Sequence, residues 1–219
     1  MGGVSAARTA AGIWLAGAAV YLISEAIAAA SVPGYSYVAD YISDLGSVAI
    51  MNIGAFMLHG SLFLAGAVVI ARACPTLGWA GWGFVLAAAA NAIGNILVGT
   101  FRSGAAGATS HINWHVIGAG MAIIGGNIAV IIVGIVSRRF GAPRSYRRAS
   151  VLIGVVGIAC LLVLIIDGLN GSRLLPVGVV ERGSVYSIVV WEIMTGMAVL
   201  RFRRAFVRGA SISAPKSPR

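Results

Sequence analysis

Residues 113–136 decide the fold, and they read NWHVIGAGMAIIGGNIAVIIVGIV, with no Asp, Glu, Lys or Arg among them. A helix rises about 1.5 Å per residue, so crossing a hydrocarbon layer about 30 Å thick takes roughly 20 mostly apolar residues. An uncharged apolar run of this length predicts a transmembrane helix and not a helix of a soluble core.

Five further segments meet the same criterion on either side of this stretch: residues 10–30, 49–71, 77–100, 149–168 and 183–200. Only 10% of the chain is charged and its mean hydropathy is +0.94, whereas a soluble domain carries about 25% charged residues. Open strands would leave backbone groups unpaired in lipid, and the alternation typical of a barrel is absent. We therefore predict an all-α membrane bundle of about six helices over residues 1–208, followed by a disordered tail over residues 209–219, which is rich in Ser and Pro.

The distribution of basic residues predicts which end of the bundle faces the cytoplasm. If the six spans alternate in direction, only Arg102, Arg173 and Arg182 of the 16 basic residues lie on the side opposite the N-terminus. Because loops rich in basic residues stay in the cytoplasm, both termini are expected there. The formal charge of +10 does not indicate nucleic acid, since the basic residues are not interleaved with stacking aromatics.

Localisation and partners follow from these features. Arginine replaces lysine almost throughout, and together with the abundant Ala and Gly this favours a GC-rich bacterial genome and the inner membrane. The expected partners are the lipid bilayer and a lipid ligand or a second membrane protein. An alternative for the first segment is a cleavable secretory signal, although the segment is long for one and carries Glu25.

Two polar stretches on the predicted outer side are candidates for a site. His111 and His115 open the fourth span four residues apart, so on a helix they share one face and suit a metal such as zinc. Two histidines do not complete such a site. The acidic candidates on the same side are Asp40, Asp44, Glu25 and Asp167, of which we list Asp40 with the two histidines. In the preceding loop, Ser43 and Asp44 are candidates either for catalysis or for capping the helix that follows.

Inside the predicted spans, polar side chains are costly unless each one finds a partner. They are His59, Asn91, Asn95, Asn127 and Glu192. Asn91 and Asn95 share a helical face, and we expect them to bind Glu192 or His59 and hold helices together. For Glu192 both a structural pairing and a role in a proton or ligand path stay open.

The chain resembles a bacterial membrane family known as domain of unknown function 998. The likeness rests on the sequence ISDLG at 42–46, on VGTF at 98–101, and on His111 and His115. It implies a six-helix membrane protein without an established activity. The family tends to place proline where this chain has Arg102, so the loop between the third and fourth spans is expected to differ in shape from that of the family. A fainter likeness, in the histidine pair with the outer Ser and Asp, links the chain to membrane hydrolases of the alkaline ceramidase type, which hold zinc.

Three functions are compatible with this pattern. The first is a non-catalytic scaffold, accessory subunit or lipid-binding module, since no complete set of catalytic groups is legible. The second is a zinc hydrolase that acts on a lipid or envelope precursor, with His111, His115 and Asp40 as ligands and Asp44 and Ser43 at the reaction centre. The third is a proton-coupled transporter that uses Glu192.

Overall fold

The computed structural model describes residues 3–101, 113–171 and 175–201, and this part of the chain is helical and contains no strand. Six helical segments are long and apolar enough to cross a membrane. They are α1 (Gly3–Ser31), the π-helix η2 (Met51–Leu58) continued by α2 (His59–Ala73), α3 (Trp79–Thr100), α4 (Trp114–Val136), α5 (Arg144–Asn170) and α6 (Val177–Arg201). The prediction of an all-α, six-helix, multi-pass membrane bundle is confirmed.

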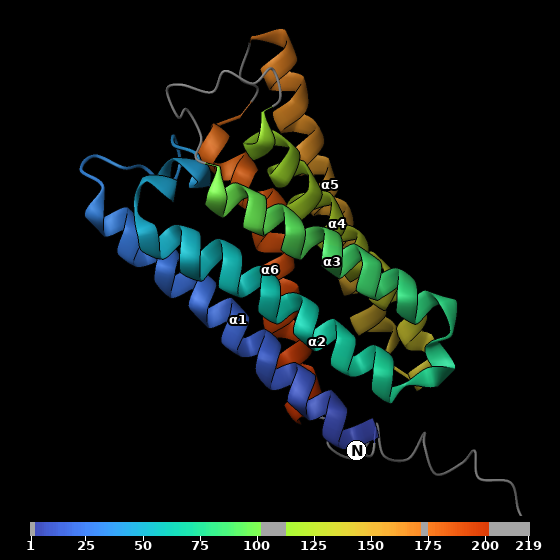
Figure 1. Ribbon diagram of the computed structural model, residues 1–219. Helices are drawn as coiled ribbons and strands as arrows, with labels where there is room; N and C mark the ends of the chain where they lie inside the picture. Colours follow the sequence, from blue (N-terminus) through green and yellow to red (C-terminus); the bar gives the residue numbers. More distant parts are fainter. Residues whose placement is uncertain (1–2, 102–112, 172–174, 202–219) are drawn as a thin grey trace, which may run out of the picture.

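Successive helices alternate in direction, so the bundle has two ends (Figure 1). The 3₁₀-helix η1 (Ile42–Ser47) lies at one end, which we call the η1 end. The 3₁₀-helices η3 (Pro75–Leu77) and η4 (Ser137–Phe140) lie at the other, which we call the η4 end. The predicted tail over residues 209–219 lies outside the described residues, so the proposed division of the chain stays a prediction.

The sixth helix begins earlier than its hydropathy predicts. Residues 183–200 were the expected span, but α6 starts at Val177 and carries Glu181 and Arg182 in its first two turns. Both charged side chains bind groups of the protein, so these residues are accommodated in the helix instead of in a loop.

Small residues bring α3 and α4 into close contact. A Cβ atom added to Gly94 would collide with backbone atoms of Ala122 and Gly118, so small residues at these positions let the two backbones approach closely. Gly12 and Ala16 are exposed on α1, and a Cβ atom added to Gly12 would meet nothing within 4 Å.

Two apolar clusters fill the core. Toward the η4 end, the aromatic cluster consists of Trp14, Phe63, Phe84 and Trp191, with the rings of Trp14 and Trp191 5.1 Å apart. Toward the η1 end, the core is built around Tyr21, Ile42 and Phe56. Polar side chains lie between the two clusters, and the candidate site is built there.

Candidate functional site

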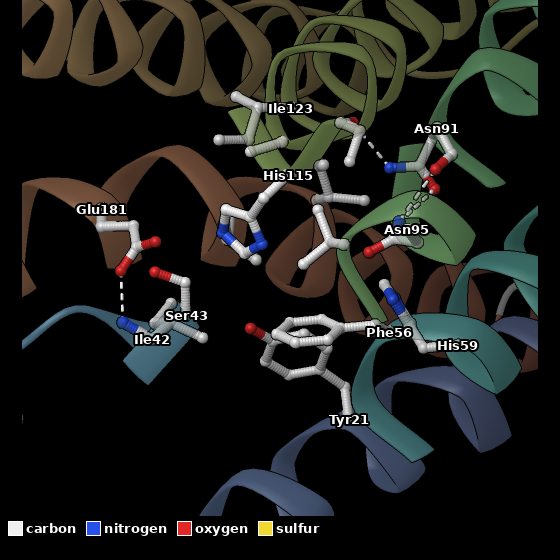
Figure 2. Close-up of a pocket in the computed structure, with 15 residues that line it drawn as sticks. Tyr21, Ile42, Ser43, Phe56, His59, Asn91, Asn95, His115, Ile123 and Glu181 are labelled. Carbon is white, nitrogen blue, oxygen red and sulfur yellow. Dashed lines mark hydrogen bonds between the residues drawn. The ribbon is translucent and has the colours of Figure 1, made fainter. Parts of the chain in front are cut away.

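A cavity of about 40 Å³ lies inside the bundle on its η1 side (Figure 2). Each of the six membrane-crossing segments except α5 contributes to its lining, and η1 covers one side. The polar residues that line it are Tyr21, Ser43, His59, Asn91, Asn95, His115 and Glu181. A buried water needs roughly 10–15 Å³, so the cavity has room for about three waters and not for a lipid chain.

His59 and Glu192 form a pair next to this cavity. The ring Nε2 of His59 lies 2.9 Å from Oε2 of Glu192, and both side chains are buried, with Glu192 fully removed from solvent. The sequence predicted that each of these two residues needs a polar partner, and in the structure they are partners of one another. Because both groups bind protons, the pair can hold one proton or two.

Several polar atoms around this pair have unused hydrogen-bonding capacity. Within the described chain, the Tyr21 hydroxyl, Nδ1 of His59 and Oε1 of Glu192 are buried and have no hydrogen-bond partner. The Tyr21 ring packs edge-on against His59, with the ring centres 5.1 Å apart. Since almost all buried polar groups in proteins are satisfied by the protein or by water, three such atoms together mark a place where water, a proton or a ligand binds.

The π-helix η2 ends directly before His59. The His59 amide donates to the carbonyl of Gly54, five residues back, which is the hydrogen bond of a π-helix. A π-helix widens the turn relative to an α-helix and is frequently found at functional sites. The local backbone therefore places His59 at the junction between an irregular segment and a regular one.

A buried ion pair fixes the loop that covers the cavity. Arg182 of α6 donates to Oε1 of Glu25 in α1 at 2.9 and 3.1 Å, and to the backbone carbonyl of Tyr37 at 2.7 Å. Its guanidinium also lies 4.5 Å from the centre of the Tyr37 ring. On the other side of Glu25, Tyr186 donates to Oε2 at 2.7 Å. We call this group, Glu25, Arg182, Tyr37 and Tyr186, the arginine latch.

Beside the latch, Glu181 holds η1. Its carboxylate accepts a hydrogen bond from the backbone amide of Ile42, and Figure 2 shows Glu181 and Ser43 next to each other at one side of the cavity. Tyr35 donates to the carbonyl of Tyr41, which also ties the loop together. Burial raises the pKa of Tyr35, although the hydrogen bond from Arg182 opposes that shift, so the phenol stays protonated.

His115 presents one nitrogen to the cavity. Its Nδ1 lies 2.7 Å from the backbone carbonyl of Phe101. A carbonyl only accepts hydrogen bonds, so Nδ1 carries the proton and Nε2 of the neutral ring is an acceptor. Histidines that bind metals are oriented in the same way, by a backbone carbonyl at the second nitrogen.

The predicted metal ligands and catalytic residues are only partly brought together. His115 and Ser43 line the same cavity. Asp40 and Asp44 are engaged in their own loop, where their Oδ2 atoms accept the backbone amides of Ser36 and Tyr41 at 2.7 and 3.2 Å. His111 lies outside the described residues, and the described part of the chain contains no group of three or more His, Cys, Asp or Glu arranged to hold a metal. Asp44 thus caps η1, not the second span.

The asparagines join helices through partners other than those expected. Asn91 donates to the carbonyl of Ala122 at 2.7 Å and so links α3 to α4. Asn95 donates to Asn91 within α3. Asn127 donates to the carbonyl of Ser184 at 2.9 Å and links α4 to α6. The predicted bonds from Asn91 and Asn95 to His59 or Glu192 are wrong, because Asn91 bonds across the close contact with α4 and Asn95 bonds to Asn91.

Sequence reasoning missed Tyr21, the cavity role of Glu181 and the arginine latch. Tyr21 carries no signal, since a tyrosine in a transmembrane span is ordinary. The arginine latch, in contrast, does leave a signal in the sequence. Arg182 stands on the side that the charge distribution leaves almost free of arginine, so it needed an acidic partner at the same depth, and Glu25 was available.

Comparison with known proteins identifies a matching family. Residues 15–198 match the sequence profile of a family described as "Protein of unknown function (DUF998)". No curated protein and no solved structure matches the chain.

Proposed function

The chain belongs to the family of proteins of unknown function DUF998, and from this premise we propose that it is a non-catalytic, proton-coupled membrane carrier in which His59 and Glu192 bind the proton. The observation that carries the proposal is the pair itself. Two groups that both bind protons lie 2.9 Å apart, away from solvent, beside a polar cavity.

A purely structural role accounts poorly for this pair. A buried carboxylate costs several kcal/mol in lost hydration, and in membranes such residues most often mark proton or ligand paths. This bundle already fastens its helices with neutral amides, as Asn91 and Asn127 do. A further contact that only holds helices together would not need two ionisable side chains.

The pair has two states that differ by one proton. With Nε2 of His59 protonated and Glu192 ionised, the pair carries one negative charge, and Nδ1 of His59 is a free acceptor. A second proton binds at Nδ1 while the Nε2 proton passes to Oε2 of Glu192, so that both groups become neutral, and burial favours neutral groups. Uptake of a proton, or of a cation in its place, is therefore the change that this site is built to make.

The cavity supplies a route for the proton from the η1 end. His115 and Glu181 line the cavity together with Tyr21, which packs against His59. About three waters would bridge these groups within hydrogen-bonding reach of one another. The orientation we propose places both termini in the cytoplasm and the η1 end outside the inner membrane of a bacterial cell, because the described arginines, apart from Arg182, lie toward the η4 end.

Infrared difference spectroscopy between acidic and alkaline pH tests the proposal on protein in lipid vesicles. We expect a protonated-carboxyl band that Glu192→Gln removes and that His59→Gln shifts. The matched control is Asp40→Asn, which removes an acidic group bound to its own loop and should leave this band in place. A second measurement follows the internal pH of vesicles after an external acid step. If Glu192→Gln alters neither the band nor the proton flux, the pair is structural, and a scaffold, accessory or lipid-binding role takes the place of this proposal.

A zinc hydrolase is the second candidate, and the hydrogen bond from His115 to the carbonyl of Phe101 favours it. This bond leaves Nε2 available to a metal, for which His111 and Asp40 would be the further ligands and Ser43 and Asp44 the residues at the reaction centre. Zinc analysis of purified protein decides between the two. Stoichiometric zinc that is lost in the double variant His111→Ala and His115→Ala supports the hydrolase, and equal zinc content in both proteins rules the site out.

A further inference from the structure

A second hollow lies at the η4 end, between the end of α4 and the start of α5. Its volume is about 570 Å³, more than ten times that of the cavity described above. We call it the α4–α5 groove, and it is lined by Gly134, Ile135, Arg144, Arg147, Arg148, Val151 and Leu152. It has no residue in common with the cavity near His59.

The groove concentrates positive charge without a counter-charge from the protein. Arg144, Arg147 and Arg148 are spaced three and four residues apart, so they share one face of α5. All six acidic residues of the chain lie outside the groove lining. Nε of Arg147 is buried and has no hydrogen-bond partner among the described residues. A buried guanidinium nitrogen without a partner indicates an anion that the protein itself does not supply.

The rest of the groove is apolar and faces outward. Ile135 and Leu152 are 59% and 63% exposed, which suits lipid contact and not water contact at the rim of a membrane bundle. Gly134 allows α5 to approach α4 closely, since an added Cβ would lie 3.0 Å from the carbonyl oxygen of Arg147. The arginines therefore lie at one end of an apolar wall, as a headgroup lies above acyl chains.

We propose that the α4–α5 groove binds an anionic phospholipid, whose phosphate contacts Arg144, Arg147 and Arg148 and whose acyl chain lies against Ile135 and Leu152. Basic pockets between transmembrane helices bind acidic lipid headgroups by the same chemistry. Arginine is suited to the task, because its planar fork of donors matches phosphate oxygens in pairs. This proposal does not depend on the proton-coupled function, and either can fail alone.

Lipid binding to the full-length protein in detergent tests the proposal. The probes are phosphatidylglycerol and phosphatidylcholine, added separately and counted as bound lipid by native mass spectrometry. Each arginine near a lipid phosphate contributes about fivefold in affinity, so we expect at least tenfold preference of the native protein for phosphatidylglycerol. The triple variant Arg144→Gln, Arg147→Gln and Arg148→Gln should lose this preference.

Two further variants keep the test decisive. The control Arg8→Gln, Arg72→Gln and Arg138→Gln removes the same charge from exposed arginines outside the groove and should retain the preference. Leu152→Trp fills the apolar wall and keeps every charge, and it should weaken phosphatidylglycerol binding. Circular dichroism of each variant establishes that it is folded.

Three results would overturn the proposal. One is an unchanged lipid preference in the folded triple variant. Another is an equal loss in the control variant, which would make the effect one of overall charge. The third is full displacement of phosphatidylglycerol by inorganic phosphate together with unaltered binding in Leu152→Trp, which would indicate a site for free phosphate.

Discussion

Replacing Arg182 by Gln should destabilise the bundle more than any other single change to its charged residues. Arg182 donates to Glu25 through two nitrogens and to the carbonyl of Tyr37, and its side chain is only 10% exposed. Glutamine is polar, but its side chain is uncharged and shorter than that of arginine. Glu25 would then be a buried carboxylate that keeps only the hydrogen bond from Tyr186.

The size of the effect follows from the geometry. Removing one partner of a buried ion pair costs about 3–5 kcal/mol, mostly because the remaining charge stays buried and unpaired. Glu25→Gln should cost less, since the neutral amide can still accept from Arg182. The double variant should therefore be more stable than the sum of the two single losses predicts, by about 1–3 kcal/mol of coupling.

Unfolding by SDS in mixed micelles, followed by tryptophan fluorescence, measures these free energies. Arg72→Gln is the matched control, because Arg72 is exposed in the last turn of α2, and it should change the free energy of unfolding by less than about 0.5 kcal/mol. A loss below about 1 kcal/mol in Arg182→Gln, or strictly additive single variants, would refute the view that the latch holds the loop on the bundle.

Three other predictions concern packing and orientation. Asn127→Leu should cost about 1–3 kcal/mol in the same unfolding assay, because the buried hydrogen bonds of Asn127 to the Ser184 carbonyl and from the Ser187 hydroxyl are both lost. Gly94→Ala should lower the yield of monodisperse protein on size-exclusion chromatography, whereas Gly120→Ala, where an added Cβ meets nothing within 4 Å, should not. In a chain without its native cysteines, Ala39→Cys should react with an impermeant thiol reagent from outside the cell and Ser145→Cys should not, and the reverse pattern would overturn the proposed sidedness.

The number and approximate ends of the helices could be predicted because they depend on local composition alone. An uncharged run such as 113–136 has only one stable solution in lipid, whatever the rest of the chain does. The first turns of α6 are the exception. The start of α6 was misplaced because Glu181 and Arg182 lower the local hydropathy, and only the tertiary contacts show that the Ile42 amide and Glu25 satisfy them.

The partners of polar residues could not be predicted in the same way. Hydropathy shows that His59 and Glu192 lie at depth, but their contact depends on the rotation of α2 and α6 about their axes. That rotation depends on close contacts at small residues such as Gly60 of α2, where an added Cβ would lie 2.9 Å from Cβ of Asn95. The expected bonds from Asn91 were wrong for the same reason. Close packing at Gly94 brought a carbonyl of α4 within reach instead.

The arrangement of the core also restricts how a carrier could work. The cavity lies on the η1 side, and the aromatic cluster fills the bundle toward the η4 end. The indoles of that cluster are anchored, since Trp14 donates to the carbonyl of Phe63 and Trp191 to Ser150, each at 3.2 Å. A proton on Glu192 can therefore leave toward the η4 end only after the helices rearrange.

The π-helix η2 is the element suited to that rearrangement. A π-helix holds extra backbone in each turn, and moving it along the helix shifts the residues it passes by one position, a rotation of about 100°. His59 directly follows η2, so such a shift would turn its ring away from Glu192 and release the proton. Deleting Ile53, which is 61% exposed within η2, should remove the extra residue and leave a folded bundle with a lower proton flux. A folded deletion variant with an undiminished flux would show that the pair works without movement of α2.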